Sequence, residues 1–173
     1  MTSARILGVR VDCLDTAETL QRIEGFVGSG RLHQVATVNP EFVMRAQREP
    51  EFARVLEAAD LCLADGTGVV WAARRQGCAM SGPVAGTDLV EPIAATCARR
   101  GFKLFLLGAQ PGVADALATQ LSAGNPGLEV GAYAGDPGDP GDCSKTFRIR
   151  AKLLLGQGKE EGRSGRKCIG SNK

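Results

Sequence analysis

Long hydrophobic runs are absent from this chain of 173 residues. No stretch approaches the roughly 20 apolar residues that a membrane-spanning helix needs. Residues 1–12 also lack the apolar segment and cleavage site of a secretory leader. We therefore expect a cytoplasmic protein. With 43% hydrophobic residues, the chain is long enough to bury one core and too short for two large domains.

Closely spaced metal-ligating residues are absent as well. The six cysteines include no Cys-x-x-Cys pair, and His33 is the single histidine, so we expect no metal site. We expect reduced thiols, several of them buried, at Cys13, Cys62, Cys78, Cys97, Cys143 and Cys168. His33 is expected to be structural and Trp71 to pack in the core.

Two common phosphate-binding motifs are missing. No Gly-Lys-Ser or Gly-Lys-Thr occurs, which excludes a Walker loop. The turn after the first expected strand reads Asp12-Cys13-Leu14-Asp15 in place of Gly-x-Gly-x-x-Gly. A dinucleotide-binding oxidoreductase domain therefore ranks low.

Positive charge is concentrated at one end. Residues 1–142 hold 12 Lys and Arg against 17 Asp and Glu, whereas residues 143–173 hold 9 against 2. Residues 135–142 are rich in Gly, Pro and Asp, and residues 156–173 are almost free of apolar side chains. We predict a folded portion at 1–135, then a linker and a disordered basic tail at 136–173. The abrupt change in composition indicates a frameshift or a wrongly joined gene end in preference to a surface for nucleic acid or anionic lipid.

Strand and helix patterns alternate before that boundary. Apolar runs predict strands at 6–11, 34–38, 61–64, 103–107 and 128–133, the fourth being the clearest buried strand. Helical spacing follows each of the first four, and Thr87-Asp88 looks like a helix cap. This pattern predicts an α/β fold, Rossmann-like, with a mostly parallel sheet flanked by helices and incomplete at its C-terminal side.

Polar and glycine-rich turns follow three of these strands. In parallel sheets ligands bind beyond the carboxyl ends of the strands, so we expect the three turns to share one edge. Their candidate ligand-binding residues are Thr37, Asn39, Asp65, Gly66, Thr67, Gly108 and Gln110.

Each turn also has an ordinary structural interpretation. Asp65-Gly66 is typical of a tight turn, and Thr37 and Asn39 are common cap residues. Residues 108–112 resemble any glycine-rich turn between a strand and a helix. The functional alternative is that Asp65 is a general base at the end of a buried strand, beside backbone N–H groups that can meet an anion.

Taken together, four segments resemble the WecG/TagA/CpsF glycosyltransferases. They are Thr37-Val38-Asn39-Pro40-Glu41, residues 59–70 (ADLCLADGTGVV), residues 84–89 (VAGTDL) and residues 105–114 (FLLGAQPGVA). The resemblance runs from about residue 5 to residue 135 and is specific in order and spacing.

The resemblance implies inverting transfer of an N-acetylmannosamine-type sugar from a UDP-sugar to a polyprenol-diphosphate-linked acceptor, without a metal or other cofactor. Such enzymes build teichoic acid or other surface polysaccharides at the inner face of the plasma membrane, where peripheral contact is expected. Asp65 would deprotonate the acceptor hydroxyl, and Thr37 and Asn39 would line the pocket. The resemblance is compatible with a homo-oligomer, and no nucleic-acid partner is expected.

The chain departs from the family pattern in two places. Pro83 stands where an arginine usually precedes the Val-x-Gly segment, and no counterpart of the family's later strands and basic C-terminal appendage follows Asp142. The alternatives to an active transferase are therefore an inactive truncated remnant or a nucleotide-binding module without transferase chemistry.

Overall fold

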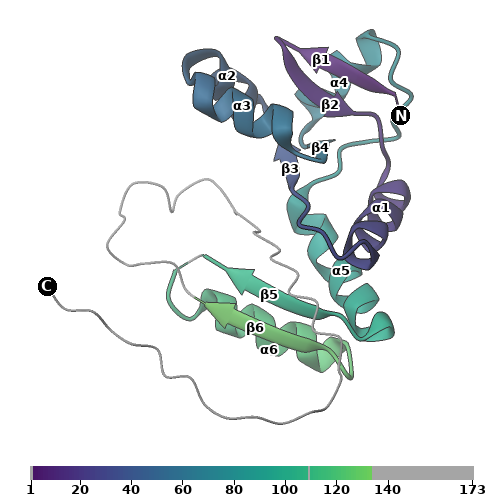
Figure 1. Cartoon of the computed structure of the whole chain (residues 1–173), viewed down its shortest axis with the longest axis vertical. Coiled ribbons are helices and arrows are strands. Elements are labelled where there is room, and N and C mark those ends of the chain that lie inside the picture. The colour runs from purple at the N-terminus through teal and green to yellow at the C-terminus, as the bar shows by residue number, and fades with distance from the viewer. Residues whose placement is uncertain (1, 109, 134–173) are drawn as a thin grey trace, which may run out of the picture.

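The computed structural model describes residues 2–108 and 110–133, and its architecture is α/β, as expected (Figure 1). The strands are β1 Ser3–Ile6, β2 Val9–Asp12, β3 Val35–Val38, β4 Leu61–Ala64, β5 Lys103–Leu107 and β6 Glu129–Tyr133. The helices are α1 Thr16–Gly28, α2 Pro40–Arg48, α3 Pro50–Ala58, α4 Thr67–Arg75, α5 Gly86–Arg100 and α6 Val113–Gly124. The predicted linker and basic tail at 136–173 lie outside the described residues.

The first predicted strand is wrong in form, because residues 6–11 span a hairpin. β1 and β2 pair antiparallel, with Ile6 opposite Val9. Leu7 and Gly8 form the turn with φ of 47° and 85°, and positive φ at both central residues matches the twist of a two-residue hairpin. The apolar pattern of residues 6–11 hid this turn, because Leu7, which lies in the turn, is itself apolar.

A four-stranded sheet in the order β1-β2-β4-β3 forms the larger part of the molecule. β3 and β4 run parallel, with Val35 opposite Leu61 and Val38 opposite Ala64, and β2 is parallel to β4. Every residue of β4 is buried, which explains its uninterrupted apolar sequence.

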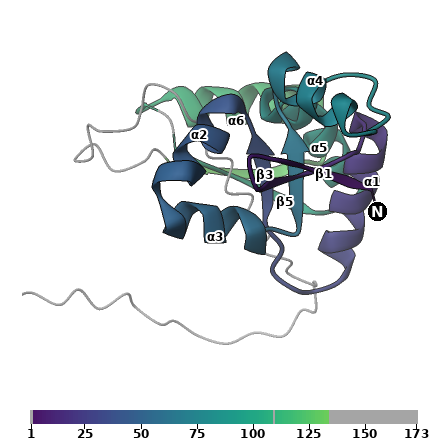
Figure 2. The ribbon, with the colours of Figure 1, turned by 90° about the horizontal axis from the view of Figure 1, so that it is seen from above.

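Helices cover both faces of this sheet. On one face, residues of α2, α3 and α4 pack against Val11, Val38 and Ala64. On the other, α1 and α5 pack against Leu61 and Leu63. Figure 2 shows β1 and β3 between α2 and α3 on one side and α1 on the other.

The remaining strands form a second sheet, which corrects the expectation of a single one. β5 and β6 pair parallel in a sheet of two strands, and α6 covers one face through Leu104, Leu106 and Leu121. On the other face Phe105 and Leu107 are each 37% exposed. The prediction that 103–107 is a buried strand is therefore wrong for three of its five residues.

Two further expectations about single residues are overturned. Trp71 is 66% exposed, because Val69, Val70 and Ala73 form the inward face of α4. Cys13 and Cys78 form a disulfide, with Cα atoms 5.5 Å apart and a sequence separation of 65. Cys62 and Cys97 are free and buried, as expected.

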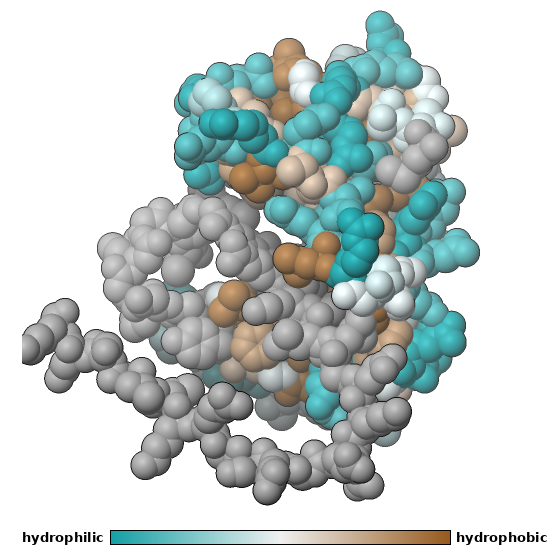
Figure 3. All heavy atoms as spheres, in the orientation of Figure 1, coloured by the Kyte–Doolittle hydropathy of each residue, from teal (hydrophilic) through white to brown (hydrophobic). Residues whose placement is uncertain are grey.

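The molecular surface in view mixes hydrophilic side chains with scattered hydrophobic ones (Figure 3). Within the described residues, no helix combines the length and the apolar character needed to cross a membrane.

Candidate functional site

The carboxyl ends of β3 and β4 bring Thr37, Asn39 and Asp65 together. Thr37 lies opposite Leu63 in the parallel register, and the Asp65 N–H donates to the Val38 carbonyl at 2.9 Å. Asp65 is thus held one residue beyond the strand pair, beside Asn39. The expectation that these two turns share one edge is confirmed.

Asn39 begins α2. Its side chain accepts a hydrogen bond from the Phe42 N–H at 2.8 Å, and Pro40 fills the first helical position, where no N–H is needed. The cap accounts for one lone pair of the side-chain oxygen and leaves the amide NH₂ available to a ligand. The structural interpretation of Asn39 as a cap is confirmed, and its role in binding substrate stays a prediction.

Gly66 turns the chain from β4 into α4. Its φ of 96° is a conformation that a residue with a side chain rarely adopts, and no side chain caps the helix. Thr67 and Gly68, the next residues, are exposed. The first N–H groups of α4 therefore face an open position next to Asp65, where a helix N-terminus favours negative charge.

Burial raises the pKa of the Asp65 carboxyl above its usual range, and the nearby charge of Asp88 raises it further. Among the described residues, no hydrogen bond to this carboxyl opposes the shift. A carboxylate with a raised pKa is a better proton acceptor, which suits a general base.

A third segment reaches the same place, and the sequence did not assign it a site role. The Val84 N–H donates to the Ala64 carbonyl at 2.7 Å, directly before Asp65. A methyl group added at Gly86 would lie 3.2 Å from Thr37 Cγ2. Asp88 follows in the first turn of α5. The signal that could have found it was present, since residues 84–89 belong to the motif that carried the resemblance.

Asp88 does not cap its helix, which corrects the expectation for Thr87-Asp88. The N-cap of α5 is Ala85, without a side-chain hydrogen bond, and the helix begins at Gly86. Thr87 Oγ1 donates weakly to Asp88 Oδ1 at 3.4 Å. The Asp88 carboxylate is exposed.

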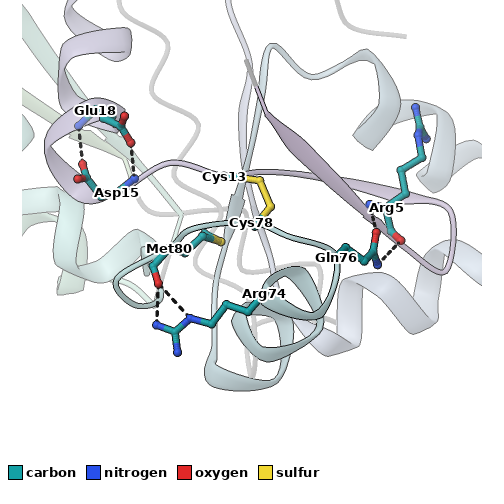
Figure 4. The surroundings of a disulfide bond; sticks show 8 residues. All are labelled: Arg5, Cys13, Asp15, Glu18, Arg74, Gln76, Cys78 and Met80. Carbon is teal, nitrogen blue, oxygen red and sulfur yellow. Dashed lines mark hydrogen bonds between the residues drawn. A yellow bond between two sulfur atoms is a disulfide. The ribbon is translucent and has the colours of Figure 1, made fainter.

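The loop between α4 and α5 is fixed at several points (Figure 4). Arg74 donates to the Met80 carbonyl at 3.0 Å and 2.7 Å and to the Ser81 carbonyl at 2.8 Å. Cys78 is joined to Cys13, directly after β2. These contacts hold the loop that delivers Val84 to the edge of β4.

The third predicted turn does not join this edge through a shared sheet. Gly108 and Gln110 follow β5, which belongs to the two-stranded sheet, so the expectation of one edge for all three turns is wrong. Gly112 adopts a left-handed conformation and begins α6. A role for Gly108 and Gln110 in binding substrate stays a prediction from the resemblance.

An open hollow lies beside the site along α2. Its volume is about 390 Å³ and its lining is Pro40, Glu41, Met44, Arg45, Arg48 and Glu49. Pro40 also lies next to Gly66 and Gly68, with its ring atoms 3.8 Å from the positions of added methyl groups there. Among the described residues, His, Cys, Asp and Glu form no group of three or more that could hold a metal ion.

The sequence pattern that defines the glycosyl transferase WecG/TagA/CpsF family matches residues 4–149. The chain belongs to this family. The match extends further than the resemblance recognised from the sequence, which ended near residue 135.

Curated relatives carry the name N-acetylglucosaminyldiphosphoundecaprenol N-acetyl-beta-D-mannosaminyltransferase. The Bacillus subtilis (strain 168) protein is 26% identical over 100 residues, which are 58% of this chain and 39% of the relative. The Bacillus spizizenii protein is 29% identical over the same shares. The Staphylococcus aureus (strain NCTC 8325) protein is 27% identical over 132 residues, or 75% of this chain and 52% of the relative. The chain thus matches about half or less of each relative's length.

Proposed function

We propose that the chain provides the base-bearing part of an inverting glycosyltransferase site. The reaction transfers an N-acetylmannosamine-type sugar from a UDP-sugar to a polyprenol-diphosphate-linked acceptor, at the inner face of the plasma membrane. The observation that carries this proposal is Asp65, a partly buried carboxyl with a raised pKa at the carboxyl end of β4. The family and the names of the relatives supply the substrate class.

The proposed step is a direct displacement. The Asp65 carboxylate takes the proton of the acceptor hydroxyl while that oxygen bonds to the anomeric carbon of the donor sugar. The bond from this carbon to the UDP oxygen breaks, and UDP leaves with the electron pair, so the configuration inverts. Thr37 and Asn39 offer hydrogen bonds to the sugar or nucleotide. The free N–H groups at Thr67 and Gly68 provide positive potential for the departing diphosphate.

Asp65→Asn tests the assignment. The variant keeps the shape of the side chain and removes its ability to accept a proton, so transfer should fall by about 10²- to 10⁴-fold or more. Transfer is measured as UDP released from UDP-N-acetylmannosamine in the presence of a lipid-linked N-acetylglucosamine acceptor. Asp115→Asn is a matched control, because Asp115 lies in the first turn of another helix, α6, and is exposed.

Two results would oppose the proposal. Turnover by Asp65→Asn at the wild-type rate would remove Asp65 from the mechanism. Wild-type protein that binds a UDP-sugar without transferring it would instead favour a nucleotide-binding module.

A further inference from the structure

Three segments, far apart in sequence, meet at the edge of β4, and the last of them has no role in the proposed chemistry. It consists of Gly86, Thr87 and Asp88, at the start of α5. The segment is placed by the backbone hydrogen bond from Val84 to Ala64. This backbone hydrogen bond to β4 therefore fixes the segment next to Asp65.

Gly86 packs closely against Thr37. An added Cβ at Gly86 would approach Thr37 Cγ2 at 3.2 Å and Thr37 Oγ1 at 3.6 Å. The absence of a side chain at residue 86 thus lets α5 approach the end of β3. It also leaves the Thr37 side chain facing the first turn of α5.

Asp88 lies on that first turn, close enough for its charge to act on Asp65. No cation pairs with either carboxylate among the described residues, where the ion pairs involve other side chains. Two neighbouring carboxylates offer only hydrogen-bond acceptors and repel each other. A ligand rich in hydroxyl groups supplies the missing donors.

We propose that Asp88 is a further substrate-binding residue of this site, whose carboxylate accepts hydrogen bonds from sugar hydroxyls beside Asp65, and that the close approach of Gly86 to Thr37 holds the start of α5, and with it Asp88, in that place. The inference rests on the proposed transferase function and deepens it. The sugar can belong to the donor or to the acceptor, since both carry the same hydroxyl chemistry.

Binding measurements on the full chain test Asp88 without requiring turnover. The probes are UDP-N-acetylmannosamine, UDP alone and a short-chain lipid diphosphate carrying N-acetylglucosamine, measured by isothermal titration calorimetry. Asp88→Asn should weaken one sugar-bearing probe about tenfold or more, which corresponds to the loss of hydrogen bonds to a charged group. The affinity for UDP alone should stay within about twofold of wild type. The probe that weakens identifies the sugar concerned.

Gly86→Ala tests the placement of Asp88, because the added methyl group would press on Thr37 Cγ2 at 3.2 Å and shift the start of α5. We expect it to weaken binding of the same probe, although alanine favours a helix over glycine. Gly25→Ala, in α1, is the matched control, because a methyl group there meets nothing within 4 Å. Asp115→Asn serves as the control for charge, as above.

The ionisation of Asp65 tests the premise of the proposal, that Asp88 lies beside Asp65. Asp88 is the charged group that raises the pKa of Asp65 beyond the effect of burial. Asp88→Asn should therefore move the ionisation of Asp65, followed by carboxyl carbon NMR, to lower pH. Asp115→Asn should leave it in place.

The outcomes separate the two proposals. Unchanged sugar affinity in Asp88→Asn, with wild-type protein that binds the probes, overturns the role of Asp88 and leaves Asp65 as the proposed base. Wild-type protein that binds neither sugar-bearing probe overturns the substrate assignment as well. If the difference between wild type and Asp88→Asn disappears when EDTA is added, Asp88 binds a divalent cation and the proposal is wrong.

Discussion

The two ends of the β3–β4 pair carry aspartates in opposite situations. At the amino end, Asp60 Oδ2 accepts from the Gln34 N–H at 2.8 Å, and Asp60 Oδ1 pairs with His33 Nδ1 at 2.9 Å. These contacts lower the pKa of Asp60, the backbone hydrogen bond from Gln34 most. At the carboxyl end, burial raises the pKa of Asp65. One end is satisfied within the protein, whereas the other holds a group that a ligand could satisfy, as expected where stability is exchanged for function.

The largest expected effect comes from the strand that both ends share. Leu63 is fully buried in β4, so Leu63→Ala should lower the free energy of unfolding by about 3–5 kcal/mol. Urea denaturation followed by circular dichroism measures it. Leu107→Ala, on the exposed face of β5, should cost less than about 1 kcal/mol. If the variant lost stability while the β3–β4 pair stayed folded, the two ends of the pair would not unfold together.

The disulfide reinforces the carboxyl end, because Cys13 follows β2, which runs parallel to β4. Replacing Cys13 and Cys78 by serine should cost about 2–4 kcal/mol of unfolding free energy. Dithiothreitol should lower the unfolding free energy of the wild type by a similar amount and leave that of the double variant unchanged. A reducing cytoplasm would hold this pair as thiols, so thiol titration of freshly isolated protein decides which form is present. Two reactive thiols at Cys13 and Cys78 would remove this difference between the ends.

Asn39 lies at the carboxyl end of the β3–β4 pair and has both a structural and a proposed binding role. Asn39→Ala removes the cap of α2 and should cost about 1 kcal/mol. Asn39→Asp keeps a cap oxygen and should keep the stability, but it loses the amide NH₂. If Asn39 lines the pocket, both variants bind the UDP-sugar more weakly. Wild-type binding by Asn39→Asp would leave the cap as its whole role.

Much of this contrast could be predicted from the sequence. The bounds predicted for β4 and β5 match the structure, and Pro50 stands at the boundary between α2 and α3. Local signals sufficed there, because apolar runs and proline act over a few residues. The parallel-strand rule placed Asp65 at the same edge of the sheet as Thr37 and Asn39 in the same way.

The parts that failed depend on contacts between distant segments. Neither the link from Cys13 to Cys78 nor the approach of Asp88 to Asp65 leaves a mark in local pattern, and Trp71 differs from its buried neighbours only in the direction it faces. The division into two sheets was missed for the same reason, since a strand's sequence does not name its partner. His33 was expected to be structural, and the structure supplies its partners, Asp60 and Ser29.

We expect a smaller effect from a change at the amino end of the β3–β4 pair. Asp60 is partly exposed, so Asp60→Asn should lower the free energy of unfolding by only about 0.5–1 kcal/mol. Sugar-nucleotide binding and transfer should be unchanged, because Asp60 lies at the opposite end of β4 from Asp65. Thermal denaturation and the UDP-release assay measure the two quantities. Loss of transfer in this variant would contradict the separation of roles between the ends.

The smallest expected effect is a pH-dependent change in stability that has opposite signs for Asp60→Asn and Asp65→Asn. The lowered pKa of Asp60 means that its stabilisation is present above its usual pKa near 3.8 and disappears as the pH falls through the lowered value. The raised pKa of Asp65 means that its ionised form costs stability near neutrality. This cost declines once the pH falls below the raised value and is gone below the usual pKa near 3.8. At pH 7 Asp60→Asn should therefore be less stable than wild type, and Asp65→Asn equal or more stable.

Urea midpoints of the wild type and both variants, measured from pH 7 to pH 3, check these signs. Both differences should shrink on acidification, one from below zero and the other from above. Because the three proteins share every other titrating group, changes common to all of them cancel in the differences. If both differences had the same sign at pH 7, the two ends would hold their aspartates in the same way, and the raised pKa of Asp65 would no longer support its role as the base.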